Sequence, residues 1–269
     1  MRHSKPLCVP LFVPGHRPEL LTKAAKSGAD AVIMDLEDAV SEVDKPAAYE
    51  GLSQIPDLSV PLVVRCNGFG SRWLERDLFE LKKNPPKIIM LPKAESFQQI
   101  DLINKKFGNL VSIMPIIESA LGLANVEDIL EHPAVFQIAF GHLDFSFDIN
   151  AKPDWDALHF ARGKMVLASR AAGKAAPLDG VTPDFRDEKI IKRDAQLARD
   201  MGFGGKLLIH PMQVAIAINV FRPSEEEYNW AKRVMEAVSN NSSAAQLDGT
   251  MIDLPVIRRA KKILVEYKI

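Results

Sequence analysis

The sequence predicts a (β/α)8 barrel, the TIM fold, with a C-terminal helical extension. The chain has 269 residues, 47% of them apolar, which suits one large α/β barrel. Short apolar or β-branched runs alternate with longer amphipathic segments, as strands and helices do in this fold. Eight such runs are present, the number that closes the barrel. The predicted strands are Cys8–Val13, Ala31–Met34, Leu62–Cys66, Lys87–Leu91, Val111–Ile117, Val135–Phe140, Ala175–Leu178 and Lys206–Ile209.

The amphipathic segments between these runs predict the helices that cover the barrel. The clearest are Pro18–Ser27, Leu74–Lys83, Ala120–Leu130 and Asp187–Met201. Gly202 follows the last of them, and glycine commonly ends a helix.

The pattern changes towards the C-terminus. A helix predicted at Met212–Phe221 is broken by Pro223, and Ser224 with Glu227 forms a capping-box signature that starts a new helix. A final helix is predicted from Leu254. We therefore expect a barrel domain at residues 1–222 and a helical extension or lid at 223–269.

Composition and charge exclude several classes of protein. Lys plus Arg number 34 and Asp plus Glu 35, so the basic excess of a nucleic-acid-binding protein is absent. No apolar run approaches the roughly 20 residues that span a bilayer, so no membrane association is expected. Cys8 and Cys66 are the only cysteines, and both fall in predicted strands. Two buried thiols outside any disulfide are typical of a cytoplasmic protein.

Two carboxylates follow consecutive predicted strands. Glu118 comes directly after Val111–Ile117, and Asp144 follows Val135–Phe140 by a few residues. Because parallel strands of a βαβ unit end at the same edge of a sheet, both side chains are expected there. Two adjacent carboxylates repel each other unless a cation or a shared proton lies between them. We interpret them as ligands of a divalent metal.

The alternatives for this pair are structural. Glu118 could be an exposed residue near a helix start, and Asp144 could cap the turn after Gly141. The sequence has no His/Cys cluster with zinc spacing, so an all-oxygen site for Mg²⁺ or Mn²⁺ fits better.

Charged and polar residues follow almost every predicted strand. In a TIM barrel these positions form the active site. They are mostly acidic, with one Arg and one Lys, which indicates a site for a metal and an anionic substrate. The residues are Asp35, Glu37, Asp38, Arg65, Asn67, Lys93, Glu118, Asp144, Asp179 and His210.

Arg65 has two interpretations, and Lys93 has one. Arg65 could pair structurally with Glu37 or Asp38, or it could bind a substrate carboxylate or enolate oxygen in bidentate fashion. Lys93 is expected to be an ion-pair partner of a neighbouring acid.

Asp253 stands just before the final helix. Pro255 lies in the first turn of that helix, and this arrangement predicts that Asp253 is its N-cap.

Several motifs occur in the order of one known family. They are Leu11-Phe-Val-Pro-Gly15, Gly28-Ala-Asp-Ala-Val-Ile-Met-Asp-Leu-Glu-Asp-Ala-Val40, Val64-Arg-Cys-Asn67, Leu91-Pro-Lys93, Ile117-Glu118, Phe140-Gly-His-Leu-Asp144, Gly202-Phe-Gly-Gly-Lys206 and Ile209-His-Pro-Met-Gln213. Taken together, these motifs resemble the β subunit of citrate lyase and its stand-alone relatives, within the HpcH/HpaI aldolase/citrate lyase family.

This resemblance implies a set of site residues. It implies Mg²⁺, with Mn²⁺ as a substitute, bound by Glu118 and Asp144, and Arg65 as the contact for the substrate anion. It adds Glu118, Pro14 and Gly15 as substrate-binding candidates.

The resemblance also changes the expectation for Asp253. Lyases of this group carry an Asp in a similar Asp-x-Pro setting and often donate it across a subunit interface. Asp253 is therefore a catalytic candidate, and a homotrimer or hexamer is expected.

The implied activity is carbon–carbon lyase chemistry on a 3-hydroxyacyl thioester such as citryl-, malyl- or citramalyl-CoA. The products would be a 2-oxo acid and an acyl thioester, carried on CoA or an acyl-carrier protein. Glu37 and Asp38 join the catalytic candidates because they would orient Arg65 and metal-bound water.

Two departures from the family bear on this activity. Cys8-Val9 replaces the usual Arg-Ser before the first strand. Asp38 replaces the His base of the metal-dependent 2-oxo-acid aldolases, which favours the thioester lyases. The alternatives are an aldolase acting on pyruvate and an aldehyde, and a non-catalytic subunit of a lyase complex.

Overall fold

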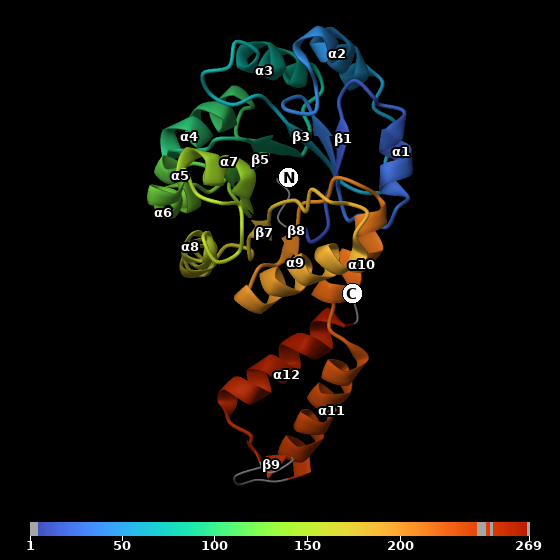
Figure 1. The fold of residues 1–269 in the computed structure, drawn as a ribbon, viewed down its shortest axis with the longest axis vertical. Helices are drawn as coiled ribbons and strands as arrows, with labels where there is room; N and C mark the ends of the chain where they lie inside the picture. Colours follow the sequence, from blue (N-terminus) through green and yellow to red (C-terminus); the bar gives the residue numbers. More distant parts are fainter. Residues whose placement is uncertain (1–4, 241–245, 248–249, 268–269) are drawn as a thin grey trace. The chain divides into compact units, whose positions relative to one another are not determined.

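Eight parallel strands form one sheet in sequential order, and the sheet closes into a barrel (Figure 1). The computed structural model describes residues 5–240, 246–247 and 250–267. Closure occurs where Leu208 pairs with Leu11, and the Phe12 N–H donates to the Leu208 carbonyl at 2.8 Å. The predicted barrel is confirmed. The strands are β1 (Leu11–Pro14), β2 (Val32–Asp35), β3 (Leu62–Arg65), β4 (Ile88–Leu91), β5 (Ser112–Ile117), β6 (Ala139–Phe140), β7 (Leu178–Asp179) and β8 (Gly205–Lys206).

The interior of the barrel is filled by apolar side chains from alternate strand positions. Ile88 with Met90 and Met114 with Ile116 are two residues apart on neighbouring strands, and all four belong to one buried cluster. This spacing follows from the two-residue period of a strand. The core therefore fixes which strand residues point outward, and the parallel pairing places the strand ends at one rim.

The last three strands are shorter than predicted. β6 starts at Ala139 rather than Val135, because the fully buried Gln137 side chain bonds to the backbone of Leu7 and Ala176 and interrupts regular pairing. β7 starts after Pro177, which has no N–H to donate. At the N-terminus, β1 begins at Leu11, so Cys8 lies before the strand and is only half-buried.

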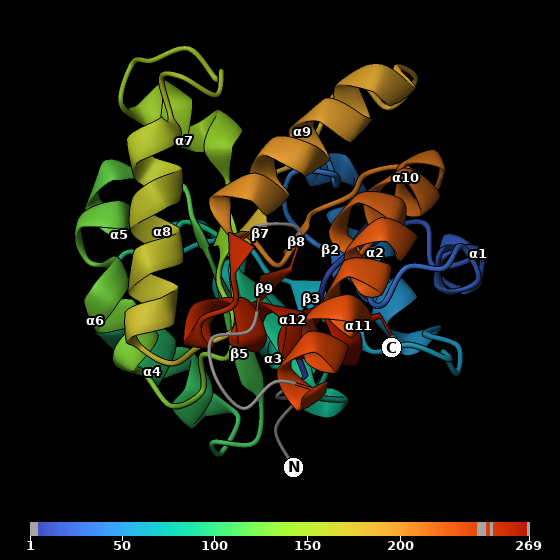
Figure 2. The same cartoon turned by 90° about the horizontal axis from the view of Figure 1, so that it is seen from below.

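Helices surround the barrel, and α4, α5, α6 and α8 lie together along one side (Figure 2). The helices are α1 (Leu20–Ala25), α2 (Lys45–Ser53), α3 (Leu74–Lys83), α4 (Phe97–Lys106), α5 (Ala120–Ala124), α6 (Val126–Glu131), α7 (His142–Asp148), α8 (His159–Ala171), α9 (Glu188–Met201) and α10 (Met212–Phe221). The helix predicted at Ala120–Leu130 is divided at Asn125, whose side chain donates to the Glu95 carbonyl at 2.8 Å. As predicted, α9 ends at Gly202, which has a φ of 99°.

The chain divides into two compact units, Met1–Ala217 and Ile218–Ile269. The predicted boundary at residue 222 stays a prediction. In the second unit, α11 (Glu225–Asn240) packs against α12 (Leu254–Glu266) around Ala231, Val234, Ala260 and Ile263. The short strands β9 (Gln246–Leu247) and β10 (Thr250–Met251) pair between these helices.

The caps predicted for these two helices are present. The backbone N–H of Ser224 donates to Glu227, and the N–H of Glu227 donates to the Ser224 hydroxyl, which is the predicted capping box. Asp253 accepts a hydrogen bond from the Val256 N–H at 3.0 Å and caps α12. Among the described residues, no helix is long and apolar enough to cross a membrane.

Candidate active site

Arg65 ends β3, and carboxylates from β2 and the loop after it surround its guanidinium. Its Nε and Nη2 donate to the two oxygens of Asp35, each at 2.6 Å, and Asp35 is its register partner on β2. Its Nη1 lies 3.2 Å from Glu37 and 3.3 Å from Asp38. The structural pairing considered for Arg65 therefore exists, with Asp35 as the main partner.

The sequence places Asp35 among the strand-end residues but gives it no role of its own, although strand order indicates one. Asp35 and Arg65 end neighbouring strands, so their side chains meet. Burial alone would raise the pKa of Asp35, but the Arg65 guanidinium beside it lowers that pKa below its ordinary value. The bidentate ion pair holds Arg65 in one orientation. It uses only one of the two hydrogens on Nη2.

Glu37 connects Arg65 to the next strand end. Its Oε1 accepts a hydrogen bond from Lys93 Nζ at 3.0 Å, so Lys93 is the ion-pair partner that the sequence predicted. Burial is the largest influence on Glu37, and the nearby Asp38 charge adds to it. Together they raise the pKa of Glu37 to about 6, against the opposing effect of Arg65.

Glu118 directly follows β5 and is buried, with 5% of the residue exposed. Its Oε1 accepts a hydrogen bond from the Lys93 N–H at 2.7 Å. Lys93 adopts a left-handed backbone conformation with a φ of 49°, which is unusual for a residue other than glycine. Gly141 is also required beside the carboxylate, since a Cβ there would lie 2.2 Å from Glu118 Oε2. The local backbone is thus arranged around this carboxylate.

Asp144 lies at the same rim as Glu118, one turn into α7 rather than at the strand end. β5 and β6 pair in parallel through Ile117 and Phe140, and Gly141 then begins the helix beside Glu118. Burial raises the pKa of Glu118, and the charges of Glu37 and Asp144 raise it further, to about 8. Asp144 itself is exposed and does not cap the turn after Gly141.

This donor set fits a hard divalent cation. A carboxyl whose pKa is about 8 retains its proton at neutral pH, and a cation between Glu118 and Asp144 would take the place of that proton. Within the described ranges, no group of three or more His, Cys, Asp or Glu side chains is placed to hold a metal. Mg²⁺ commonly binds through one or two carboxylates and keeps its other positions for water or substrate oxygens.

A second ionic cluster lies at the ends of β7 and β8, and the sequence did not indicate its cations. Asp179 is fully buried between Arg162 Nε at 2.9 Å and Lys206 Nζ at 2.8 Å. Burial opposes ionisation of Asp179, but the two cations lower its pKa below the ordinary value. Burial lowers the pKa of the adjacent His142 to about 4, so this imidazole is neutral.

The remaining candidates lie at different places. Pro14 is the register partner of Asp35, and the Gly15 N–H donates to the Asp35 carbonyl at 2.8 Å. His210 stacks on Phe185 with ring centres 4.4 Å apart. Asp253 belongs to the second unit, where its side chain is exposed at the start of α12. The substrate-binding role of Pro14 and Gly15 and the catalytic role of Asp253 stay predictions.

The model of the HpcH/HpaI aldolase/citrate lyase family matches residues 9–211, which contain the strand ends described above. The chain belongs to this family. It is 35% identical to the citrate lyase subunit beta of Leuconostoc mesenteroides subsp. cremoris, covering 94% of this chain and 91% of that protein. It is 32% identical to a (3S)-malyl-CoA thioesterase of Cereibacter sphaeroides strain ATCC 17025, covering 95% and 93%.

Solved structures of family members match the whole fold. CitE of Mycobacterium tuberculosis, crystallised with magnesium, acetoacetate and coenzyme A, has a TM-score of 0.88 at 31% identity, and each chain is covered over 100% of its length. Another crystal structure of that protein, with magnesium and pyruvate, has a TM-score of 0.79 at 28% identity, covering 97% of this chain and 100% of that one. Relatives of this chain therefore bind magnesium, oxo acids and coenzyme A.

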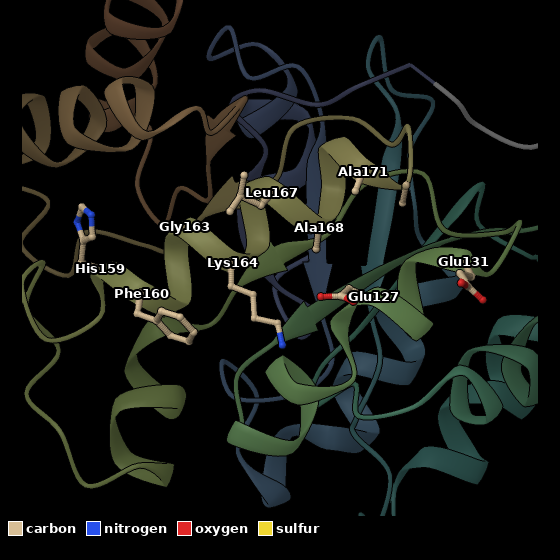
Figure 3. A pocket seen from close by; sticks show the side chains of 10 residues that line it. Glu127, Glu131, His159, Phe160, Gly163, Lys164, Leu167, Ala168 and Ala171 are labelled. Carbon is tan, nitrogen blue, oxygen red and sulfur yellow. The ribbon is translucent and has the colours of Figure 1, made fainter.

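A large groove elsewhere is distinct from this site. It has a volume of about 840 Å³ and lies between α6 and α8 on the outside of the barrel (Figure 3). Phe160, Lys164 and Leu167 line it from α8, and Glu127 and Glu131 from α6. None of these residues follows a strand end, so we assign the chemistry to the rim that holds Glu118 and not to this groove.

Proposed function

We propose that the protein is a Mg²⁺-dependent carbon–carbon lyase. Its substrate would be a 3-hydroxyacyl thioester that bears a carboxylate, such as citryl-, malyl- or citramalyl-CoA. The observation that supports this most is the buried Glu118 next to Asp144, on the rim where Asp35 orients Arg65. Family membership supports the same class of reaction.

Glu118 and Asp144 are the residues that would hold the cation. When bound, the cation supplies positive charge that lowers the pKa of the substrate hydroxyl and stabilises the oxyanion. The Glu118 carboxylate is pre-positioned by the Lys93 N–H and by the space above Gly141. The chain would thus provide two ligands and leave the other positions to the substrate and water.

Arg65 would bind the negative charge that develops on the thioester side. A fixed guanidinium stabilises an enolate oxygen without having to reorient during the reaction. Asp35 fixes this orientation from one side, and Glu37 and Asp38 contact Nη1 from the other. We assign Glu37 and Asp38 the role of orienting Arg65 and nearby water.

The reaction requires one bond cleavage and two proton movements. The bond between the α-carbon and the hydroxyl-bearing carbon breaks, and its electron pair goes to the thioester enolate. The hydroxyl loses its proton as its carbon becomes the ketone of the 2-oxo acid, and the enolate α-carbon gains a proton. We propose Asp253 as the group that exchanges the proton at the α-carbon. Lyases that this chain resembles often donate such an Asp across a subunit interface, so we further propose that Asp253 acts across the interface of a homotrimer or hexamer.

Thioester hydrolysis is a second candidate activity, since similar proteins carry the name (3S)-malyl-CoA thioesterase. We propose CoA as the carrier because the M. tuberculosis relative was crystallised with it. An aldolase that uses a His base is less well supported, because Asp38 holds that place and contacts Arg65.

The test is to incubate the full chain with malyl-CoA, citramalyl-CoA and citryl-CoA, each with Mg²⁺ and again with EDTA. The lyase proposal predicts Mg²⁺-dependent release of glyoxylate, pyruvate or oxaloacetate, respectively, in equal amounts with acetyl-CoA. Free CoA with malate would indicate hydrolysis instead. Cleavage of a 4-hydroxy-2-oxo acid alone would indicate the aldolase, and no turnover with any substrate would support a non-catalytic subunit.

A further inference from the structure

A buried lysine on α2 lies where local electrostatics disfavours it. Lys45 is the first residue of α2 and is 4% exposed. A cation at a helix N-terminus opposes the helix dipole, and burial of an ammonium without a carboxylate is costly. Within residues 5–240, the Lys45 ammonium forms no ion pair. Helix formation does not explain a lysine at this position, so its hydrogen bonds must.

The contacts of Lys45 show what its ammonium does. The Nζ donates to the carbonyl of Leu36, to the carbonyl of Glu37 at 3.2 Å and to Asn67 Oδ1 at 2.9 Å. Asn67 Nδ2 donates to the same Leu36 carbonyl at 3.0 Å. Lys45 and Asn67 therefore bind the backbone of the segment that presents the Glu37 side chain.

Asn67 is itself held in place by the neighbouring helix α3. Its backbone N–H and its Nδ2 donate to Asp77 Oδ2 at 2.6 and 2.7 Å. The other oxygen of Asp77 accepts the Tyr49 hydroxyl at 2.8 Å. The buried network thus runs from α3 through Asn67 and Lys45 to the loop after β2.

The same loop is bound from its other side by the Arg65 partner. The Asp35 carboxylate accepts the N–H of Glu37 at 2.9 Å and the N–H of Ala39 at 2.8 Å. Lys45 and Asn67 bind the carbonyls, so the peptide units after β2 are fixed through both their donors and their acceptors. The Glu37 side chain can then reach Arg65 and Lys93.

We propose that Lys45 and Asn67 are positioning residues for the lyase site: they fix the loop after β2, which Asp35 binds and from which Glu37 reaches Arg65, so that Arg65 keeps its catalytic orientation. This inference rests on the proposed function, because it requires Arg65 to act on the substrate. Lys45 and Asn67 do not contact Glu118, which follows β5, or Asp144, which lies in α7. Loss of the network is therefore expected to change turnover more than metal binding.

The test compares Lys45→Met and Asn67→Ala with Tyr49→Phe as a matched control. Tyr49→Phe removes a bond to Asp77 but leaves the bonds of Asp77 to Asn67 intact. We expect Lys45→Met to lower kcat by about 10- to 100-fold, as a misplacement of about 1 Å does. KM and the Mn²⁺ affinity measured by calorimetry should change little. Tyr49→Phe should keep the wild-type kcat.

Two further measurements separate positioning from folding. Lys45→Arg keeps the charge and the donors, so it should recover part of the kcat lost in Lys45→Met. The Lys45→Met/Asn67→Ala double variant should lose no more than the larger single loss, because both residues act on one loop. Circular dichroism and thermal unfolding establish that each variant is folded at the assay temperature.

The outcomes distinguish this inference from the proposed function. Folded Lys45→Met with wild-type kcat would overturn the inference and leave the lyase proposal standing. Two other results would also overturn it: a loss of Mn²⁺ affinity in Lys45→Met as large as its loss of kcat, or a loss of kcat in Tyr49→Phe as large as that in Lys45→Met. Either would show that the effect is a general loss of structure. Absence of thioester cleavage by the wild-type protein would instead refute the proposed function, and this inference with it.

Discussion

The two halves of the barrel rim each contain a buried aspartate at a strand end, and they use it differently. Asp35 at the end of β2 binds Arg65, and Asp179 at the end of β7 binds Arg162 and Lys206. Neighbouring cations lower the pKa of both aspartates. A buried aspartate paired with a cation therefore does not by itself identify an active site.

The surroundings of the two aspartates differ in charge. Around Asp35 lie further acids, and the pKa is raised to about 6 for Glu37 and to about 8 for Glu118. Asp179 has two cations and the neutral His142 around it. The first half has an excess of negative charge that a cation would neutralise, whereas the second half already has its cations. We infer that the first half, together with Asp144 in α7, performs the chemistry and that the Asp179 cluster of the second half stabilises the barrel.

Glu118→Gln should have the largest effect on the metal affinity and activity that we assign to the first half. It removes one of two proposed metal ligands, so the loss of metal affinity should exceed the roughly 10- to 100-fold that loss of a residue supporting a ligand costs. Mg²⁺-dependent cleavage should be abolished. Calorimetric titration with Mn²⁺ and the thioester assay provide the measurements.

Asp179→Asn is the control from the other half. It should lower the thermal stability, because Arg162 and Lys206 would lose their buried partner, but a folded sample should keep the wild-type metal affinity. Full activity of the wild type after chelator treatment would contradict the assignment of Glu118.

Substitution of Asp253 tests whether the reaction needs a residue that belongs to neither half of the barrel rim. Asp253→Asn keeps an efficient cap on α12 but removes the carboxylate. General acid–base groups contribute about 10²- to 10⁴-fold, so kcat should fall by that factor while unfolding is little changed. Asp187→Asn, which changes the cap of α9, is the matched control and should keep its activity. Equal activities of the two variants would leave Asp253 with only its structural role.

The same substitution at Arg65 and at Arg162 compares the two halves of the rim directly. Arg65→Lys keeps the charge but loses the fork that binds both oxygens of Asp35, and loss of one oriented donor typically costs about 10²- to 10³-fold in kcat. Arg162→Lys should lower the melting temperature and leave kcat of the folded protein near the wild-type value. Steady-state kinetics and thermal unfolding of both variants test this, and a reversed pattern would exchange the roles of the two halves.

The sequence could predict the first half of the rim better than the second, for a physical reason. Apolar or β-branched strands of four to six residues identify β2 to β5, and site residues such as Arg65 and Glu118 lie at or directly after their ends. β6 to β8 contain only two residues each, so their periodicity is weak. The predicted strand at Lys206–Ile209 was displaced by one residue at its start, and Lys206 was not expected to bind Asp179.

Contacts between residues far apart in the chain could not be predicted from local patterns. Lys45 meets Asn67 only because the fold brings the start of α2 to the segment after β3, and a lysine in a first helical turn usually indicates an exposed residue. Likewise, nothing in the sequence distinguishes the left-handed conformation of Lys93 that directs its N–H to Glu118. Strand order was predictable, whereas the side-chain network that orients the site requires the three-dimensional structure.

The smallest expected effect is on the pH dependence of the free energy of unfolding. A rise in pH should remove the contribution of Glu118 in the first half, whereas a fall in pH should remove that of Asp179 in the second. The pKa of Glu118 is raised in the folded protein from 4.5 to about 8. The folded state therefore retains a proton that the unfolded state has lost, and the metal-free protein loses stability as the pH rises from about 5 to 8. Asp179 has a lowered pKa when folded, so its contribution is present above about pH 4, the ordinary value, and is lost as the pH falls further.

Urea unfolding in EDTA at pH 5 and pH 8 tests the first half. Glu118→Gln should be more stable than the wild type at pH 8, by on the order of a few kcal/mol, and the gain should shrink at pH 5, where Glu118 is protonated. Saturating Mn²⁺ should reverse the order, because only the wild type gains stability by binding it. The difference between the wild type and Asp179→Asn should instead shrink below pH 4. If the free energy of unfolding of the metal-free wild type does not change between pH 5 and 8, the proposed accumulation of negative charge around Glu118 is wrong.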